Sequence, residues 1–227
     1  MSHLNSPVGA SRGVYAARTY WTGVRARGTA MGLRELKRER TRRLISDKAF
    51  ELFTDHGFGR TTVEQIAAAA EVGPSTLYRY YPTKETLVLE FVEDSMFGAL
   101  NWFREQPAEL DLPDGLQSVI ELVLDQLERN PDRVRAVYEL AGQTPSVGAR
   151  LAEVTWRWRN ELTVELTQRL AGDSVEFTAA LAAGTVMNII EIVVQTWVDN
   201  PDGTQVKDLA HEAMGLLRGG GIPLPTA

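Results

Sequence analysis

The segment Pro74–Tyr81, with the sequence PSTLYRYY, combines side chains whose chemistry suits recognition of a polar partner. Hydroxyls, phenols and a guanidinium can all bond to phosphate oxygens and to the edges of DNA bases. Leu77 is the one apolar anchor, and Tyr81 follows it four residues later, on the same side of a helix. Pro74 suits a first helical position and Pro82 ends the helix. A helix this short and polar is not a core helix, and it fits the major groove of DNA.

Residue types that carry catalysis or bind metals do not form a recognisable group in the sequence. The three histidines, His3, His56 and His211, are far apart, and there is no cysteine. No serine stands in a nucleophile-elbow spacing, and no HExxH motif or phosphate-binding loop is present. We therefore expect no enzyme activity, no metal site and no cofactor. A chain without cysteine also suits a reducing compartment, so we expect a cytoplasmic protein.

Two helices are predicted to support the polar segment. One starts after Thr62, whose hydroxyl can cap it, and the break Glu71–Gly73 separates it from Pro74. The other is Leu33–His56, which ends at Gly57. The residues predicted to be buried on these helices are Ile45, Ala49, Leu52, Phe53, Val63, Ile66, Ala67 and Ala70. Phe50, Phe53 and Phe58 are predicted to close the small core between the helices.

The N-terminal half of the helix Leu33–His56 is densely basic, with Arg34, Lys37, Arg38, Arg40, Arg42 and Arg43. Such a run can be a solvated face, or it can contact phosphates. Next to two helices joined by a tight turn, we favour phosphate contact.

The stretches DHGFGRTTVEQIA, from Asp55, and STLYRYYPTKE, from Ser75, resemble the DNA-binding domain of the tetracycline-repressor (TetR) family of transcriptional regulators. The resemblance covers residues 33–89. It implies an all-α fold of about nine helices, with an N-terminal three-helix helix-turn-helix domain and a larger helical ligand-binding and dimerisation domain. It also implies a repressor that binds double-stranded DNA as a homodimer and responds to a small effector.

Within this resemblance, two sets of residues are expected to contact DNA. The set expected to face the groove is Pro74, Ser75, Thr76, Arg79 and Tyr80. The set expected to position phosphates is Thr62, Gly73, Tyr78 and Lys84. The resemblance places Lys84 near a phosphate.

Two positions depart from the pattern of the family. The family usually has glycine where Glu71 stands and a capping serine or threonine where Gly73 stands. A left-handed backbone costs a residue other than glycine about 1–2 kcal/mol, so we expect the turn to shift toward Gly73. The missing hydroxyl removes one possible phosphate donor.

Charge is distributed unevenly along the chain, although the net charge is −6. Residues 1–86 carry 14 basic and 8 acidic residues, and residues 87–227 carry 10 and 22. A basic N-terminal part joined to an acidic remainder suits a polyanion-binding domain on a body with another partner.

Four regions follow from these patterns. Residues 1–32 form a basic extension with no acid, which we interpret as a disordered arm or as sequence upstream of a true start at Met31. Residues 33–83 form the DNA-binding domain, 84–218 the ligand-binding and dimerisation domain, and 219–227 a flexible tail.

In the larger domain, proline and glycine signals separate the predicted helices, and Gln106–Asp114 is predicted to be a loop. These helices are Lys84–Arg104, capped by Thr83, then Gly115–Arg129, Asp132–Gln143, Ser146–Leu170, Ser174–Val198 and Thr204–Leu217. No segment alternates long enough to predict a sheet.

The helix Ser174–Val198 is apolar on all sides, so we expect it to be buried on all sides. Asn188, Glu191 and Gln195 interrupt the run, so we do not expect it to cross a membrane. With Thr204–Leu217, it is predicted to form half of a four-helix dimer interface.

The effector is predicted to be an elongated apolar, acyl-CoA-like molecule, since TPSVGARLAEVTWRWRNELTVEL resembles acyl-CoA-like binders of the family. Arg150 or Arg157 would hold an anionic head group. The candidate lining residues are Trp102, Phe103, Tyr138, Gln143, Trp156, Met187, Asn188 and Glu191. Two alternatives stay open: a cationic drug held near Glu191, and a structural helical dimer that does not bind DNA.

Overall fold

The computed structural model describes residues 32–200, 203 and 205–223, so the N-terminal extension lies outside the described residues. In these ranges the chain forms nine α-helices and no strand, which confirms the all-α prediction. The helices are α2 (Leu33–His56), α3 (Val63–Ala69), α4 (Pro74–Tyr80), α5 (Lys84–Arg104), α6 (Leu112–Glu128), α7 (Pro131–Gln143), α8 (Pro145–Thr167), α9 (Val175–Asp199) and α10 (Val206–Arg218).

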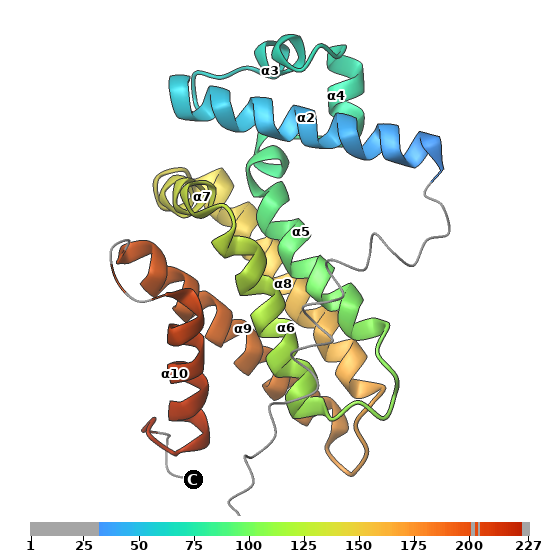
Figure 1. The fold of residues 1–227 in the computed structure, drawn as a ribbon, viewed down its shortest axis with the longest axis vertical. Coiled ribbons are helices and arrows are strands. Elements are labelled where there is room, and N and C mark those ends of the chain that lie inside the picture. Colours follow the sequence, from blue (N-terminus) through green and yellow to red (C-terminus); the bar gives the residue numbers. More distant parts are fainter. Residues whose placement is uncertain (1–31, 201–202, 204, 224–227) are drawn as a thin grey trace, which may run out of the picture.

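Helices α2, α3 and α4 form a head at the end of the molecule opposite α10 (Figure 1). Their core consists of the buried residues Ile45, Ala49, Ile66, Ala67, Ala70, Leu77 and Tyr81, together with Leu87 of α5. Phe53 packs against this core and against the Phe58 ring, with the ring centroids 5.2 Å apart. Phe50 does not pack in this core, so the predicted group of three phenylalanines forms only in part, and all three line a cavity beside it.

Helix α5 connects the head to the body, which consists of α6–α10 (Figure 1). Thr83 caps α5 as predicted, because its hydroxyl oxygen accepts a hydrogen bond from the Thr86 N–H at 3.2 Å. Further along, α5 packs between α6 and α8. Trp158 of α8 is fully buried there, and its indole N–H donates to the Met96 carbonyl oxygen at 2.7 Å. The two ends of α5 therefore pack in different cores, one in the head and one in the body.

Several helices of the body begin earlier than the sequence pattern predicts, and the reason is proline. Helix α6 begins at Leu112 rather than Gly115, because Asp111 Oδ1 accepts a hydrogen bond from the Asp114 N–H at 3.2 Å. Pro113 then lies in the first turn, where no N–H is needed. Pro131 and Pro145 are likewise first residues of α7 and α8, not stops before them.

Helix α9 is buried on one side in the single chain, and the burial expected on its other side would need a second subunit or a ligand. Its buried side includes Val186, Ile190 and Val194, which pack in the core of the body. On the other side, Phe177, Leu181 and Ile192 are 68%, 56% and 63% exposed. By length and composition alone α9 could span a membrane, but its buried side packs against α8 and α10.

Candidate nucleic-acid interface

Helix α3 is held at its start by two reciprocal hydrogen bonds. Thr62 Oγ1 accepts from the Gln65 N–H at 3.2 Å, and Gln65 Oε1 accepts from the Thr62 N–H at 2.8 Å. This capping box confirms Thr62 as the predicted cap. Behind it, the Thr61 hydroxyl is buried and lies 3.1 Å from the Leu52 carbonyl oxygen and 2.9 Å from that of Gly57. The end of α2 and the start of α3 are thereby fixed together.

The turn between α3 and α4 differs from the prediction. Glu71 itself takes the left-handed conformation, with φ of +55°, whereas Gly73 has φ of −71°. The expected shift of the turn toward Gly73 is therefore wrong. Two backbone hydrogen bonds hold Glu71 in place, from its own N–H to Ala68 O at 3.1 Å and from Val72 N–H to Ala67 O at 2.9 Å. The helix-turn-helix therefore gives Glu71 a backbone conformation that its residue type disfavours.

Helix α4 has one buried side and one free side. Leu77 is fully buried and Tyr81, its C-terminal cap, is nearly so, as the sequence predicts. The exposed residues are Gly73, Pro74, Ser75, Tyr78 and Arg79, while Thr76 and Tyr80 are half-buried. Among the described residues, no hydrogen bond engages the side chains of Ser75, Thr76, Tyr78 or Arg79. The Arg79 guanidinium lies 5.6 Å from the centre of the Tyr80 ring.

Helix α4 lies on the side of α2 that is turned away from the body (Figure 1). The polar groups of Ser75, Thr76, Tyr78 and Arg79 form no hydrogen bond among the described residues, so a partner can bond to all of them. A short, rigid helix that presents hydroxyls and a guanidinium outward can bond to base edges and phosphates in a major groove.

Lys84 has structural contacts that the sequence did not reveal. Its ammonium donates to the carbonyl oxygens of Phe58 at 2.9 Å and Thr61 at 3.0 Å, and it lies 4.5 Å from the centre of the Phe58 ring. Two of its three N–H groups thus tie the start of α5 to the α2–α3 connection. At most one N–H is left for another acceptor.

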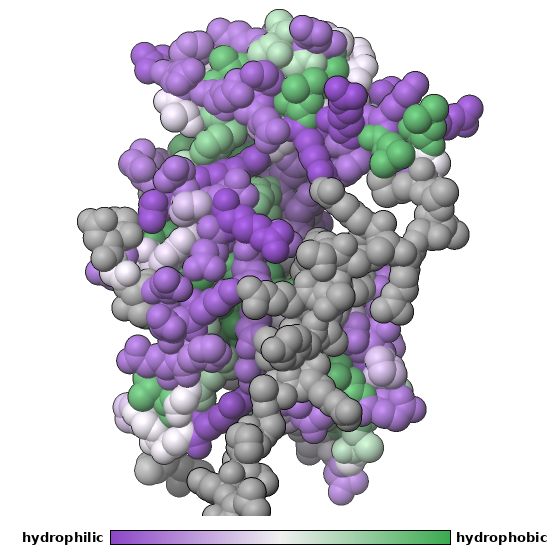
Figure 2. Space-filling model, viewed as in Figure 1, coloured by the Kyte–Doolittle hydropathy of each residue, from purple (hydrophilic) through white to green (hydrophobic). Residues whose placement is uncertain are grey.

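The basic run of α2 divides into two groups with different roles. Arg34, Lys37, Arg38 and Arg40 are exposed and form no ion pair among the described residues. Arg43 is exposed and pairs with Glu39 at 2.8 Å. Hydrophobic residues also reach the surface at the free end of α2 (Figure 2), where Leu33 and Leu36 are exposed. The first turns of α2 therefore project beyond the core of the head.

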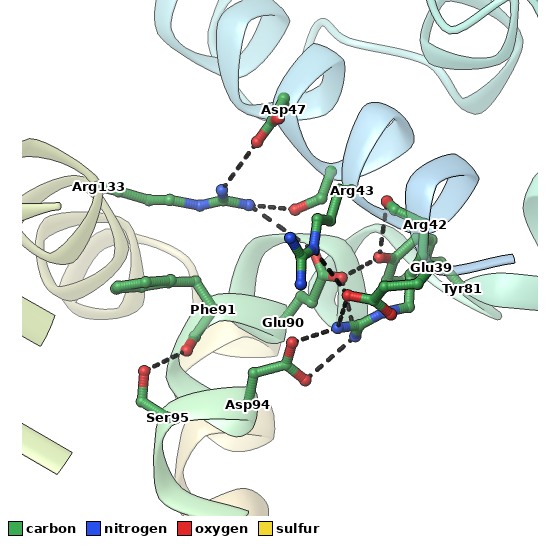
Figure 3. Close-up of polar contacts among 11 residues, drawn as sticks. Glu39, Arg42, Arg43, Asp47, Tyr81, Glu90, Phe91, Asp94, Ser95 and Arg133 are labelled. Carbon is green, nitrogen blue, oxygen red and sulfur yellow. Dashed lines mark hydrogen bonds and ion pairs between the residues drawn. The ribbon is translucent and has the colours of Figure 1, made fainter. Parts of the chain in front are cut away.

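Arg42 belongs to a polar cluster that joins the head to α5 and α7, shown in Figure 3. It pairs with the buried carboxylate of Glu90 at 2.9 Å and with Asp94. The Tyr81 phenol donates to Glu90, and Arg133 reaches across from α7 to Ser46 and, at 3.8 Å, to Glu90. Arg42 was predicted to contact phosphate, but besides Glu39, 3.1 Å away on the same helix, it pairs with acids some fifty residues later in the chain. In the fold it fastens α2 to α5.

The predicted effector residues are not gathered around one cavity. Trp102, Phe103 and Met187 are buried in the core of the body. Trp156 is 59% exposed on α8, which fits a second surface and not the wall of a cavity within one chain. Asn188 is exposed on α9. Periodicity alone could not separate these positions, because the lining of a pocket depends on how distant helices pack.

Two of these residues, Tyr138 and Glu191, do line one pocket, between α7, α8 and α9. Its volume is about 530 Å³, and Leu151 and Ile192 contribute apolar surface. Burial, with the nearby charge of Glu191, raises the pKa of Tyr138 to about 12, so the phenol stays protonated at neutral pH. Gln143 lies elsewhere and lines a separate cavity between head and body.

The two arginines considered for an anionic head group are already paired. Arg150 lies 3.1 Å from a carboxylate oxygen of Glu93, and Arg157 contacts the other oxygen of the same carboxylate. Arg150 also pairs with Glu153 at 2.9 Å. An anionic ligand would have to displace these carboxylates.

The chain is similar to a protein family, to individual proteins and to solved structures. Residues 45–91 match the family described as bacterial regulatory proteins, tetR family. A putative mycofactocin biosynthesis transcriptional regulator, MftR of Mycobacterium tuberculosis, is 26% identical over 71% of this chain and 82% of its own length. The HTH-type transcriptional regulator TcmR of Streptomyces glaucescens is 42% identical over 33% of each chain.

Among solved structures, the TetR-family repressor FadR of Thermus thermophilus, in complex with lauroyl-CoA, is 24% identical with a TM-score of 0.53. The alignment covers 82% of this chain and 100% of that one. This likeness shows that the two chains share the fold.

Proposed function

We propose that this chain, which belongs to the TetR family of transcriptional regulators, is a cytoplasmic repressor that binds an inverted-repeat operator as a homodimer and is released by a small effector. The DNA-binding part of this proposal rests on the exposed side of α4. Its polar side chains face outward, form no hydrogen bond within the described chain, and stand on a helix fixed by Leu77 and Tyr81.

A single head would bind DNA weakly. Non-specific binding by one basic module has a Kd of about 10⁻⁴–10⁻⁶ M at physiological salt. Two copies of α4 about 34 Å apart would read two half-sites one turn apart on the same face of the duplex. Dimerisation is therefore part of the proposed mechanism.

The exposed stripe of α9 supports a dimer. Phe177, Leu181, Asn188, Ile192 and Gln195 follow one another at intervals of four, seven, four and three residues, so they share one side of the helix. No atom lies within 4 Å of where a side chain on Gly184 would begin, which leaves room for a partner helix. Leu216 and Leu217 of α10 extend the apolar surface. In the dimer, Asn188 would be a polar group that sets the register.

The effector pocket that the geometry supports best is the one lined by Tyr138, Leu151 and Glu191. Its size suits a drug-sized or elongated apolar molecule. The lauroyl-CoA complex of the T. thermophilus FadR supports an acyl-CoA-like effector. A ligand with a coupling of about 1–3 kcal/mol would lower DNA affinity by roughly 5–150-fold.

A cationic hydrophobic drug is the second candidate for the effector. Glu191 supplies a carboxylate to the pocket, and both arginines considered for an anionic head group are held by Glu93. Titrating acyl-thioesters and cationic dyes separately into the protein–DNA complex distinguishes the two classes. Release by the dyes and not by the thioesters would overturn the acyl-CoA-like assignment.

The DNA-binding proposal is tested by selecting bound duplexes from a random library and measuring two matched variants on the result. Arg79→Ala should lower discrimination between preferred and changed bases by about 1–3 kcal/mol. Tyr78→Phe, which removes a single hydroxyl, should weaken all duplexes alike by about 0.5–1.5 kcal/mol. Both residues are exposed, so neither change should alter folding.

If both variants lose the same affinity for every duplex, the division between groove and phosphate contacts is wrong. If no duplex is selected at all, the chain is a helical dimer without DNA-binding activity.

A further inference from the structure

A cavity of about 380 Å³ lies between the head and the body, separate from the pocket of Tyr138 and Glu191. The C-terminal half of α2 and the residues after it form one wall, with Phe50, Phe53 and Phe58. Helix α7 forms the opposite wall, with Arg133, Ala136 and Leu140, and Leu87 and Val88 of α5 complete the lining. This volume lies in the range of small-molecule sites.

The polar group that distinguishes this cavity is Arg133. Its side chain extends from α7 toward α2 and α5 (Figure 3). The terminal nitrogens of Arg133 are engaged by Ser46, Asp47 and Glu90, but its Nε is buried and has no hydrogen-bond partner. These partners hold the flat guanidinium in place in the lining of the cavity. The Nε is closed off from the cavity, so the guanidinium offers an occupant its flat surface.

Three phenylalanine rings contribute to the lining of the cavity. The Arg133 guanidinium lies 5.3 Å from the centre of the Phe50 ring and 5.7 Å from that of Phe91. The Phe53 and Phe58 rings are tilted against each other at 51° beside the cavity. Flat rings and a flat cation on the walls favour a flat aromatic occupant.

The charges around Arg133 argue against a charged occupant. Asp47 and Glu90 already offset its positive charge, and Glu139 adds a further carboxylate to the lining. An anion would meet these carboxylates without a free cation to pair with. An organic cation would meet the guanidinium itself. A neutral molecule avoids both costs.

We propose that the cavity between α2 and α7 is a second ligand site, which binds an uncharged, planar aromatic compound that stacks against the phenylalanine rings and the Arg133 guanidinium. The occupant contacts the head through the phenylalanines of α2 and the body through α7. It is therefore placed to fix how the head sits on the body.

The test uses the full chain and prodan, a fluorescent naphthalene ketone without charge. We expect saturable binding with a blue-shifted emission. Ala136→Phe, which fills the cavity from α7, should weaken binding at least about tenfold. The matched control Ala152→Phe fills the pocket beside Tyr138 instead and should bind prodan as the unchanged protein does.

A further variant examines the flat cation in the lining. Arg133→Lys keeps a positive charge near Glu90 and removes the planar guanidinium, so it should weaken prodan binding about five- to tenfold. Thermal unfolding of each variant shows whether the fold is retained.

The proposal is overturned if the unchanged protein does not bind prodan saturably, or if Ala136→Phe binds it normally. It is also overturned if Ala152→Phe is the variant that loses binding. Because no DNA is present, any of these results leaves the proposed operator binding untouched.

Discussion

Glu71 is the residue whose conformation is least expected from its type. Its φ of +55° lies in the left-handed region, which costs residues other than glycine about 1–2 kcal/mol. The turn between α3 and α4 needs this conformation, so the sequence carries a strain that a glycine would remove.

Glu71→Gly should therefore raise the free energy of unfolding by about 1 kcal/mol, since part of the gain is offset by the greater freedom of glycine in the unfolded chain. Urea unfolding followed by circular dichroism measures the change. Glu71→Ala is the matched control, because alanine keeps the left-handed cost and should bring no gain. Equal stabilities of the glycine and alanine variants would show that the turn is not strained.

Single residues also show how far the sequence could predict the site. Thr62 and Leu77 were placed correctly because capping and burial are set by neighbours within four residues. Arg42 was not, since its partners Glu90 and Asp94 are brought to it only by the packing of α5 against α2. Lys84 is similar, because its two carbonyl partners lie more than twenty residues earlier.

At the scale of elements, the start of α4 lacks a side-chain cap. Gly73 occupies that position, and a side chain added there would meet no atom within 4 Å. Serine at this position can accept a hydrogen bond from a free N–H of the first turn, or donate one to a phosphate.

Gly73→Ser should thus stabilise the fold by a few tenths of a kcal/mol and tighten binding to all duplexes roughly two- to fivefold. Fluorescence anisotropy with a selected operator and an unrelated duplex measures both affinities. Gly73→Ala, which adds the carbon without the hydroxyl, should not tighten binding. A gain from alanine as large as that from serine would exclude a phosphate contact by the hydroxyl.

The attachment of α2 to α5 depends on the charged cluster in Figure 3. Arg42→Ala leaves the buried Glu90 with one distant arginine and should cost about 1–3 kcal/mol of stability. Arg43→Ala, one residue along, breaks only an exposed pair with Glu39 and should cost less than about 0.5 kcal/mol. Chemical unfolding of both proteins gives the comparison. Similar losses in the two variants would mean that Glu90 does not need Arg42.

The ends of a helix could be predicted where they depend on residues close by in the sequence. Helix α2 begins and ends as its sequence predicts, at Leu33 and His56 before Gly57. Helix α6 was predicted to begin late, because proline marks both loops and first helical turns, and only the Asp111 cap distinguishes them. In α4, α6, α7 and α8 a proline lies at one of the first two positions, and only α6 among them has a side-chain cap.

At the scale of the whole molecule, α2–α4 form the head and α6–α10 form the body, with α5 between them (Figure 1). Sequence patterns predicted helices in both parts. They could not predict the cavities, whose walls come from helices far apart in the chain.

The proposed dimer leads to a prediction at this scale. Ile192→Glu places a charge in the middle of the exposed stripe of α9 and should convert the dimer to monomers, because a buried unpaired carboxylate is costly. Val164→Glu changes a residue of similar exposure on α8 and should leave the dimer intact. Sedimentation velocity at micromolar concentration measures the state. A dimer that survives Ile192→Glu would place the interface elsewhere.

Hydroxyl-radical footprinting of the chain on a selected operator tests the central claim most directly. Two copies of α4 in successive major grooves should protect two sets of sugars on one face of the duplex, centred about 10–10.5 base pairs or a small multiple of that apart. Replacing Ser75, Thr76 and Arg79 together by alanine should abolish both sets. A single protected set, or protection that survives this replacement, would contradict the account.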